Sequence, residues 1–276
     1  EHRMYNDKKI GVVVPAYNEE RFIASVINTV PDFVDKIYVV DDASTDNTYE
    51  IASNIARQKC HYEPPPCHCE ELRDEAISEA GSGGRIAVIT HEQNKGIGAA
   101  VVSGHKVACK DRMDIVAIMA GDGQMDPAIL HKILAPVVEG KADFAKGDRL
   151  SIPQYKKAMS AWRAFGNFLL THLTRIASGY WHISDPQDGY TAISTKTLQK
   201  LDLDRIKEGF AFENDILVKL NVIGARVVNI PHPAIYQGQH SKIRYPRFIV
   251  KTSWLLLKDF LWRLKVKYFR RDSKSC

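Results

Sequence analysis

The sequence predicts an α/β protein with an open, mostly parallel β-sheet that is covered by helices. Short runs of β-branched residues alternate along the first half of the chain with segments whose apolar residues have helical spacing. Right-handed crossovers between such strands produce parallel pairs with helices on the faces of the sheet. A chain of 276 residues with 45% hydrophobic residues can bury a large core. This composition excludes collagen, disordered chains and disulfide-rich scaffolds.

Four strands of this sheet are expected within the first 120 residues. They are runs rich in Ile and Val at residues 10–14, 36–40, 85–90 and 115–120. Helices are expected between them over residues 20–30, 45–56 and 98–109. Ligands of such sheets bind at the carboxyl ends of the strands. The expected binding loops are therefore residues 15–19, 41–46 and 121–126.

The second half of the chain has a less regular alternation. Helices are expected over residues 156–178 and 213–220, and short strands over 190–194 and 227–230. Residues 1–244 are interpreted as one domain, and residues 245–276 as an appended helical tail. Residues 58–84 are interpreted as a surface insertion, because three prolines, three cysteines and GSGG interrupt the pattern. The cysteine and histidine spacing there matches no standard zinc site, so a loop is favoured over a metal site.

The formal net charge of +5 combines two opposite contributions. Residues 242–276 carry 11 Lys and Arg against two acidic residues, a charge of +9, whereas residues 1–241 carry −4. The tail is helical in period, basic on one side and rich in Leu, Phe and Trp on the other, which is typical of a helix at a membrane interface. The residues expected at the headgroup boundary are Trp254, Leu255, Leu256, Phe260, Leu261 and Trp262, and those expected on lipid phosphates are Lys258, Arg263, Lys265 and Lys267.

The cellular location expected from the sequence is the cytoplasm, with the protein peripheral on the cytosolic face of a membrane. Five cysteines, an odd number, favour free thiols and a reducing compartment. Residues 1–9 are polar and charged, which does not predict a secretory leader. The alternatives for the tail are that it packs on the protein's own core or on a second subunit, or that the chain has lost membrane spans.

Aspartates follow two of the expected strands. Asp41 and Asp42 come after the second strand, and Asp122 comes after the fourth. An oxygen site made by Asp122, Gln124, water and substrate phosphates is what Mg²⁺ or Mn²⁺ prefers. The alternative is that these aspartates only cap helices or form turns. Together with the loop at residues 15–19 after the first strand, these loops make three strand ends with acidic residues, which jointly favour a binding site.

No glycine-rich phosphate loop follows the first strand, which excludes an ordinary P-loop enzyme and a dinucleotide dehydrogenase. Nucleotide phosphates would then be held by a metal and by basic side chains. The candidates are Arg149, Arg163, Lys242 and Arg244.

Six motifs in order resemble glycosyltransferase family 2. They are PAYNEE from residue 15, VVDDASTDNT from 39, NKGIGAA from 94, GDGQMDP from 121, KGDR from 146 and DPQDGYTAIS from 185. The likeness is greatest to the polyprenyl-phosphate sugar transferases of the dolichol-phosphate mannose synthase type. It implies a GT-A fold with a Rossmann-like nucleotide-binding half, a nucleotide-diphosphate sugar donor, a divalent metal, and inversion at the anomeric carbon.

The resemblance also implies roles for particular residues. Asp41 would join the nucleotide-sugar site, with Asp42 on the base or ribose side, and Asp122 and Gln124 would bind the metal. The other residues implied on the nucleotide-sugar donor are Pro15, Ala16, Tyr17, Glu19 and Lys242. The residues implied on the acceptor phosphate are Arg149, Arg163 and Arg244. The acidic residues implied on the acceptor side, as sugar-orienting groups or as a base, are Asp185, Asp188, Glu213 and Asp215.

The chain departs from the family pattern at Ala120, where many relatives carry the first carboxylate of the metal motif. A metal site with fewer protein oxygens is expected. The function expected is transfer of a sugar to dolichyl or undecaprenyl phosphate, which is already anionic and needs no dedicated base. The alternatives are a family member acting on a saccharide or another hydroxyl, and an inactive protein that binds nucleotide sugar and membrane. Nucleic acid is not an expected partner, and the oligomeric state is left open.

Overall fold

The computed structural model describes residues 5–59, 78–80, 84–152, 161–233 and 245–269. Within these ranges one eight-stranded sheet has the strand order β3-β4-β2-β1-β5-β7-β6-β8. The strands are β1 (Ile10–Ala16), β2 (Lys36–Asp41), β3 (Ser78–Ala80), β4 (Ile86–Thr90), β5 (Ile115–Ile118), β6 (Phe144–Asp148), β7 (Thr191–Ser194) and β8 (Val227–Pro231). The predicted α/β class with an open sheet is confirmed.

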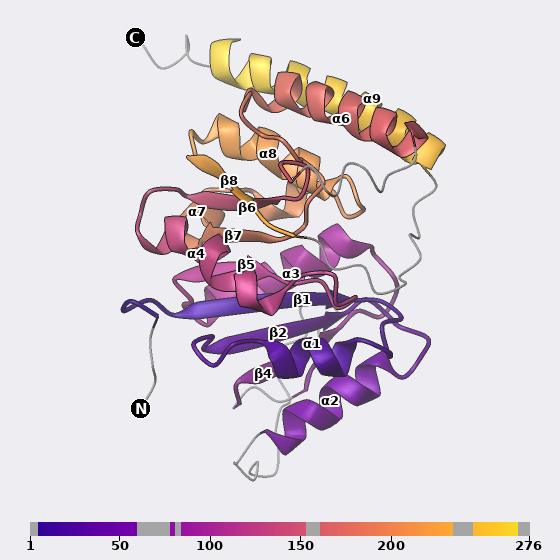
Figure 1. The fold of residues 1–276 in the computed structure, drawn as a ribbon, viewed down its shortest axis with the longest axis vertical. Coiled ribbons are helices and arrows are strands. Elements are labelled where there is room, and N and C mark those ends of the chain that lie inside the picture. The colour runs from indigo at the N-terminus through magenta and orange to yellow at the C-terminus, as the bar shows by residue number, and fades with distance from the viewer. Residues whose placement is uncertain (1–4, 60–77, 81–83, 153–160, 234–244, 270–276) are drawn as a thin grey trace.

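Helices cover the sheet on its two faces (Figure 1). The α-helices are α1 (Ile23–Thr29), α2 (Thr48–Gln58), α3 (Ile97–Lys110), α4 (Leu130–Val138), α6 (Ala161–Ser178), α7 (Thr195–Leu198), α8 (Phe212–Val222) and α9 (Tyr245–Leu264). Short 3₁₀ turns occupy Pro127–Ile129 and Leu203–Arg205, and a π-helical turn, Lys265–Phe269, follows α9.

Strand β1 shows how the core divides between these faces. Its side chains alternate: Val13 packs in one buried cluster, whereas Val12 and Val14 pack in the cluster on the opposite face. All seven residues of β1 are buried. A strand buried on both sides has a continuous apolar sequence, which is why residues 10–14 contain almost only Val and Ile.

The sheet is more mixed than the sequence predicts. Four pairs are parallel, but β7 runs antiparallel to both of its neighbours, β5 and β6. At the other edge β3, which lies in the expected surface insertion, pairs antiparallel with β4. The reversal at β7 has a functional consequence. It carries the segment before β7, residues 185–190, to the edge at which the parallel strands end, because β7 enters the sheet there.

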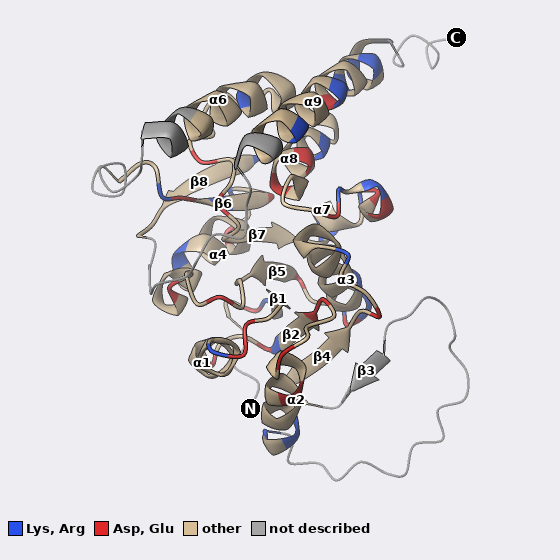
Figure 2. Cartoon of the chain, turned by 90° about the vertical axis from the view of Figure 1, so that its right-hand side faces the viewer, with Lys and Arg blue, Asp and Glu red and all other residues tan. Residues whose placement is uncertain are grey.

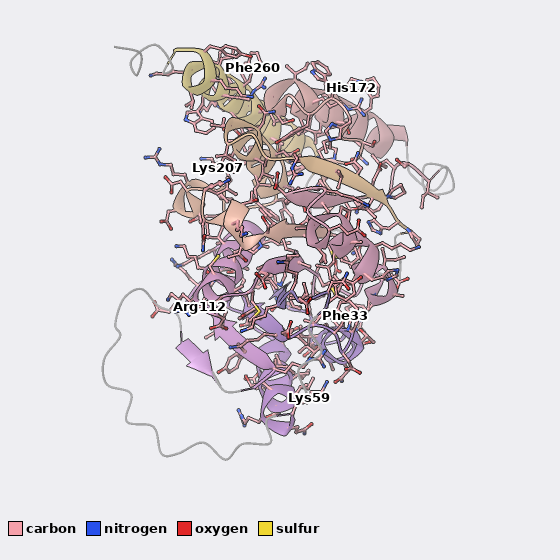
Figure 3. The ribbon with its side chains drawn as sticks, turned by 90° about the vertical axis from the view of Figure 1, so that its left-hand side faces the viewer. Phe33, Lys59, Arg112, His172, Lys207 and Phe260 are labelled. Carbon is pink, nitrogen blue, oxygen red and sulfur yellow. The ribbon has the colours of Figure 1, made fainter. Side chains whose placement is uncertain are left out.

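The C-terminal helix α9 lies alongside α6 and above α8 at one end of the molecule (Figure 1). Leu256 is 2% exposed and packs with Ala177 of α6 and Val218 of α8, and Phe260 joins this cluster. Leu256 and Phe260 are therefore inner residues of the protein, not lipid-facing ones as expected. The packing also brings His172 of α6 and Phe260 of α9 to the same end of the molecule (Figure 3).

Two basic residues expected on lipid phosphates instead hold α9 to the domain. Arg263 donates to the carbonyl oxygen of Ile176 at 3.1 Å and to Asn221, and Lys267 donates to Asn221 at 2.9 Å. No helix within the described ranges combines the length and the apolar content that crossing a bilayer requires.

Candidate functional site

The loops after β1, β2 and β5 lie together at one edge of the sheet. Ala16 is paired with Asp41 in the register of β1 and β2, and the Gly121 amide donates to the Pro15 carbonyl at 3.0 Å. The loop after β1 is also tied to the next one, since the Asn18 amide donates to Ser44 Oγ at 3.0 Å. Figure 2 shows Asp and Glu positions gathered beside the ends of these strands. The three loops expected to bind ligand are thus neighbours.

Most of the residues expected on the nucleotide border this edge. Pro15 and Ala16 are buried as the last residues of β1, and Tyr17 and Glu19 are half-buried in the loop that follows. The Glu19 amide donates to Thr48 Oγ1 at 2.8 Å at the start of α2. The backbone of this loop is therefore fixed by the loop after β2.

Asp41 has an acceptor atom that the protein does not use. The residue is 2% exposed, and its Oδ2 accepts from the Ser44 amide at 3.2 Å. Its Oδ1 is buried and has no hydrogen-bond partner among the described residues. Burial raises the pKa of this carboxyl, although the hydrogen bonds from Ser44 act in the opposite direction. A buried unpaired acceptor is costly, so Oδ1 is suited to accept a hydrogen bond from a ligand.

Asp42 is buried to the same degree, but its oxygens are fully engaged. They accept from His91 Nδ1 at 2.7 Å, from the Lys95 amide at 2.9 Å and from the Gly96 amide at 2.7 Å. Burial alone would raise its pKa, but these hydrogen bonds outweigh that effect and lower it. Asp42 therefore anchors the loop before α3, and the geometry favours Asp41 over Asp42 for contact with a ligand.

Asp122 and Gln124 form a compact pair after β5. The backbone amide of Gln124 donates to Asp122 Oδ1 at 3.0 Å, and the side-chain Nε2 of Gln124 donates to Asp122 Oδ2 at 2.9 Å. Gly123 between them has a φ of +72°. Nothing in the described ranges forms a group of three His, Cys, Asp or Glu side chains that could hold a metal by itself. One carboxylate and one amide carbonyl suit a hard cation that takes its remaining ligands from water and substrate phosphates.

A second polar cluster surrounds Arg149, just after β6. Its Nε donates to Asp185 Oδ2 at 2.9 Å and lies 3.2 Å from Asp188 Oδ2. One Nη donates to Asp185 Oδ1 at 3.3 Å and to the Gln187 carbonyl at 3.1 Å. The expected acceptor-side residues Arg149, Asp185 and Asp188 are thus brought together. The guanidinium is oriented by two carboxylates that are each no more than 3% exposed.

The cluster contains two residues that the sequence interpretation missed. Lys146 of β6 is 1% exposed and donates to the Asp188 carbonyl, and His232, after β8, contacts Asp188 Oδ2 through Nε2 at 2.7 Å. Lys146 lies within the KGDR motif, whose lysine was not singled out. His232 stands between two prolines, and this was the one local signal for it.

Glu213, at the start of α8, borders the same cluster. Its Oε1 lies 3.0 Å from the position that a Cβ on Gly189 would occupy, so a side chain there would require Glu213 to move by a few tenths of an ångström. Burial raises the pKa of Glu213 to about 8; Lys146 and Arg149 oppose the rise, and Asp188 and Asp185 add to it.

Asp215 does not join the cluster. It is 1% exposed, accepts from the Lys207 amide at 2.9 Å and pairs with Lys219 on its own helix. These contacts hold Asp215 to its own helix and to the segment before it, and the acceptor-side role expected for it stays a prediction.

The structure does not describe the side chains of three expected basic residues. Lys242 and Arg244 lie outside the described residues. Arg163 lies in α6, but its side chain is outside what the structure describes.

The two clusters are adjacent. Met125, in the loop after β5, accepts from the Ala120 amide through Sδ at 3.2 Å, and its Cε lies 3.2 Å from a Cβ built on Gly189. The Tyr190 hydroxyl donates to the Asp126 carbonyl at 3.0 Å. The edge of the sheet therefore presents the acidic strand-end loops beside a buried arginine cluster.

Comparisons with known proteins agree with the motifs. The family model described as glycosyl transferase family 2 matches residues 11–202. The UDP-N-acetylglucosamine–dolichyl-phosphate N-acetylglucosaminyltransferase of Methanococcus voltae is 32% identical over 196 residues, which cover 71% of this chain and 73% of that protein. The undecaprenyl-phosphate mannosyltransferase of Micrococcus luteus is 26% identical, over 81% of this chain and 82% of that protein.

Among solved structures, the glucosyl-3-phosphoglycerate synthase of Mycobacterium tuberculosis, crystallised with Mn²⁺, UDP and phosphoglyceric acid, is similar in fold. The TM-score is 0.60 at 19% sequence identity, over 93% of this chain and 78% of that one. At this identity the likeness concerns the fold.

Proposed function

The chain belongs to glycosyl transferase family 2, and from this premise we propose that it transfers a sugar, with inversion, from a nucleotide-diphosphate sugar to a polyprenyl phosphate at the cytosolic face of a membrane. The observation that carries the proposal is the contact between the loop after β5 and the segment before β7. It brings the loop after β5, where the donor would bind, next to a cluster with an oriented arginine. Two relatives whose names include a dolichyl or undecaprenyl phosphate support the choice of acceptor.

The donor would lie across the ends of β1, β2 and β5. The buried Oδ1 of Asp41 would accept a hydrogen bond from the base or ribose. Asp122 and Gln124 would hold a Mg²⁺ or Mn²⁺ ion, which when bound neutralises charge on the diphosphate leaving group. Pro15, Ala16, Tyr17 and Glu19 would border the nucleoside.

The acceptor phosphate would meet Arg149. The Nε and one Nη of this side chain are held by Asp185 and by the Gln187 carbonyl. Held this way, the guanidinium can present its remaining N–H groups to a phosphate without losing further conformational entropy. The phosphate oxygen is already ionised at neutral pH, so the reaction needs orientation and charge screening more than a base.

The lipid chain of the acceptor would enter from the membrane that α6 and α9 face. Exposed apolar side chains on the two helices include Phe168, Val250, Trp254, Leu257 and Leu261. Lys251 and Lys258 of α9 and Lys265 of the π-helical turn after it are also exposed, and Figure 2 shows basic positions along this helix. Apolar side chains bordered by lysines favour binding to an anionic membrane surface.

The direct test is a panel of nucleotide sugars with Mg²⁺ or Mn²⁺ and a polyprenyl phosphate, scored for lipid-linked sugar. The expected result is transfer with one donor class, reduced about 100-fold or more by Asp122→Asn, since it removes the one carboxylate of the metal pair. Asp204→Asn, at an exposed ion pair with Lys106, is the matched control and should have no effect. Failure of every donor would reject the function, and full activity of Asp122→Asn would reject the site.

One observation favours a second candidate, transfer to a hydroxyl acceptor. The pKa of Glu213 is raised to about 8, which is close to the value at which a carboxylate serves best as a general base at neutral pH. With a hydroxyl acceptor Glu213→Gln should abolish turnover, whereas with polyprenyl phosphate it should leave most of it. Comparing the two acceptors with this one variant separates the candidates.

A further inference from the structure

His232 is a buried histidine whose two ring nitrogens both face acceptors. Nε2 lies 2.7 Å from Asp188 Oδ2, and Nδ1 lies 2.8 Å from the carbonyl oxygen of Pro233. The side chain is 2% exposed. A carbonyl oxygen can only accept, and an ionised carboxylate can only accept, so each ring nitrogen must carry a proton.

The geometry therefore describes an imidazolium in the folded protein. Burial acts to lower the pKa of His232, but the hydrogen bond and charge of Asp188 outweigh it, and the net pKa is raised. The pKa of Asp188 is held below its ordinary value by Arg149 and His232 in spite of its burial. The two groups are an ion pair.

The backbone at Gly147 is shaped for this pair. A Cβ at Gly147 would lie 2.6 Å from His232 Nε2 and 2.8 Å from Asp188 Oδ2. Both distances are too short for any side chain to be accommodated without displacing the pair. Glycine at this position in β6 lets the β8 end and the segment before β7 meet across the strand.

The same carboxylate oxygen also faces the arginine. Asp188 Oδ2 lies 3.2 Å from Arg149 Nε, and the other oxygen, Oδ1, accepts from the Tyr190 amide at 2.9 Å. His232 thus contacts the same oxygen of Asp188 that faces Arg149. Together with Asp185, this oxygen sets the orientation of the Arg149 guanidinium.

We propose that His232 is a positioning residue, an imidazolium that holds Asp188 in place and thereby aims Arg149 at the acceptor phosphate. The part of this proposal that concerns the acceptor rests on the proposed function. The protonation state of His232 and the orientation of Arg149 do not, and both can be measured without turnover.

The charged and titratable groups of the cluster around His232 come from four parts of the fold. Among the described residues they are Lys146 and Asp148 of β6, Arg149 just after it, Asp185 and Asp188 before β7, and Glu213 of α8. The Tyr190 ring lies edge-on to the imidazole, with the centroids 5.5 Å apart. Deprotonation of His232 at high pH removes one cation from this set, so Arg149 and Lys146 are then the cations that act on Asp188, beside the Tyr190 amide.

The first experiment is NMR of the protein labelled with ¹⁵N-histidine and ¹⁵N-arginine. Both nitrogens of His232 are expected to be protonated at pH 7 and to lose a proton only above the ordinary histidine pKa of about 6.5. The Arg149 Nε–H signal should be protected from solvent exchange in the wild type and exchange at least tenfold faster in His232→Gln. A neutral His232 at pH 7, or an unchanged Arg149 signal in the variant, overturns the proposal.

The second experiment separates positioning from folding. His232→Gln keeps a donor but no charge, and should raise the KM for polyprenyl phosphate about tenfold, the scale of a hydrogen bond to a charged group. Its nucleotide affinity should remain within about twofold of the wild type. The wild-type KM should rise as the pH passes the raised pKa of His232, and the variant should lack this dependence.

The matched control is His182→Gln. His182 is exposed and its Nε2 hydrogen-bonds the Val227 carbonyl at 2.8 Å, away from Asp188. It should behave as wild type. A His232→Gln enzyme with wild-type KM and pH profile refutes the positioning role. Absence of transfer by the wild type refutes the proposed function. In that case the NMR result still decides whether His232 is an imidazolium and whether it orients Arg149.

Discussion

Two adjacent aspartates at the end of β2 differ in what their carboxylates do. Asp42 accepts hydrogen bonds from two backbone N–H groups and from His91, whereas one buried oxygen of Asp41 has no partner in the described part of the chain. Neighbouring residues of a strand point in opposite directions, so the two carboxylates meet different surroundings. One acid supports the fold, and the other is available to a ligand.

Replacing Asp42 by alanine should lower the free energy of unfolding by roughly 2–4 kcal/mol, because two buried N–H groups lose their acceptor. The folded pKa of Asp42 is lowered, so its stabilisation is full above its unfolded pKa of about 3.9 and is lost as the pH falls through the folded pKa. Chemical denaturation at pH 7 and at pH 3 measures both effects.

Asp41→Asn should affect nucleotide binding and leave stability intact, the opposite of what is expected for the Asp42 variant. It removes a buried charge that the protein does not fully pair, so stability at pH 7 should be unchanged or higher, whereas nucleotide affinity should fall about tenfold. Calorimetric titration with UDP and GDP tests this. Equal loss of stability in both variants would contradict the distinction between the two aspartates.

Gly147 allows a close approach of two side chains. Gly147→Ala should lower the free energy of unfolding by about 1–3 kcal/mol, a usual cost of overpacking, and should separate His232 from Asp188. Gly209→Ala is the control, since a Cβ there meets nothing within 4 Å and the φ is not positive. Thermal unfolding of the two variants compares them; equal Tm values would mean that β6 adjusts without strain.

At the scale of elements, α9 carries a half-buried acid, Asp259, near α8. Burial, helped by the charge of Asp215, raises the pKa of Asp259 to about 6, and its Oδ2 has no hydrogen-bond partner in the described part of the chain. The folded form therefore binds this proton more tightly than the unfolded form, whose pKa is about 3.9. Stability conferred by this contact must fall as the pH rises from about 4 to about 6.

Asp259→Asn should therefore be more stable than the wild type at pH 7.5 and equal to it near pH 4. Thermal unfolding at the two pH values measures this, with Asp202→Asn, an exposed acid paired with Arg205, as the control that should show no such change. A lower Tm for Asp259→Asn at pH 7.5 would show that the ionised carboxylate has a partner that stabilises α9.

At the scale of the whole molecule, α9 joins the domain to the surface proposed to meet the membrane. Removing the chain after Tyr245 would strip the cover from Ala177 and Val218, so a truncation would change stability as well as binding. Substitutions on the outer face avoid this difficulty.

The double variant Leu257→Gln, Leu261→Gln should bind vesicles with anionic lipid about tenfold more weakly or worse, because each exposed leucine would otherwise be buried in the interface. Sedimentation with phosphatidylglycerol vesicles measures the binding. Phe210→Gln, at an exposed aromatic residue outside α6 and α9, is the control. Unchanged binding of the double variant would reject this face as the membrane surface.

The sequence by itself determined the class of fold, the first strands and the loops that follow them. It could do so because a strand buried on both faces must be continuously apolar and because parallel strands all end at one edge. The motifs in these loops also identified the family, since their residues are local in the chain. The pairing of the loops after β1, β2 and β5 followed from the same rule.

Only the tertiary structure decided which of the acids are free to act. Asp42 and Asp215 are engaged by donors that lie far along the chain or one helical turn away, and His232 acquires its charge from Asp188, 44 residues earlier. The packing of α6 and α8 likewise determines which side of α9 faces inward. An amphipathic period predicts an apolar side, but it does not distinguish contact with the protein from contact with a membrane. Hydrogen-bond satisfaction and burial depend on neighbours in space, so these assignments required the packed molecule.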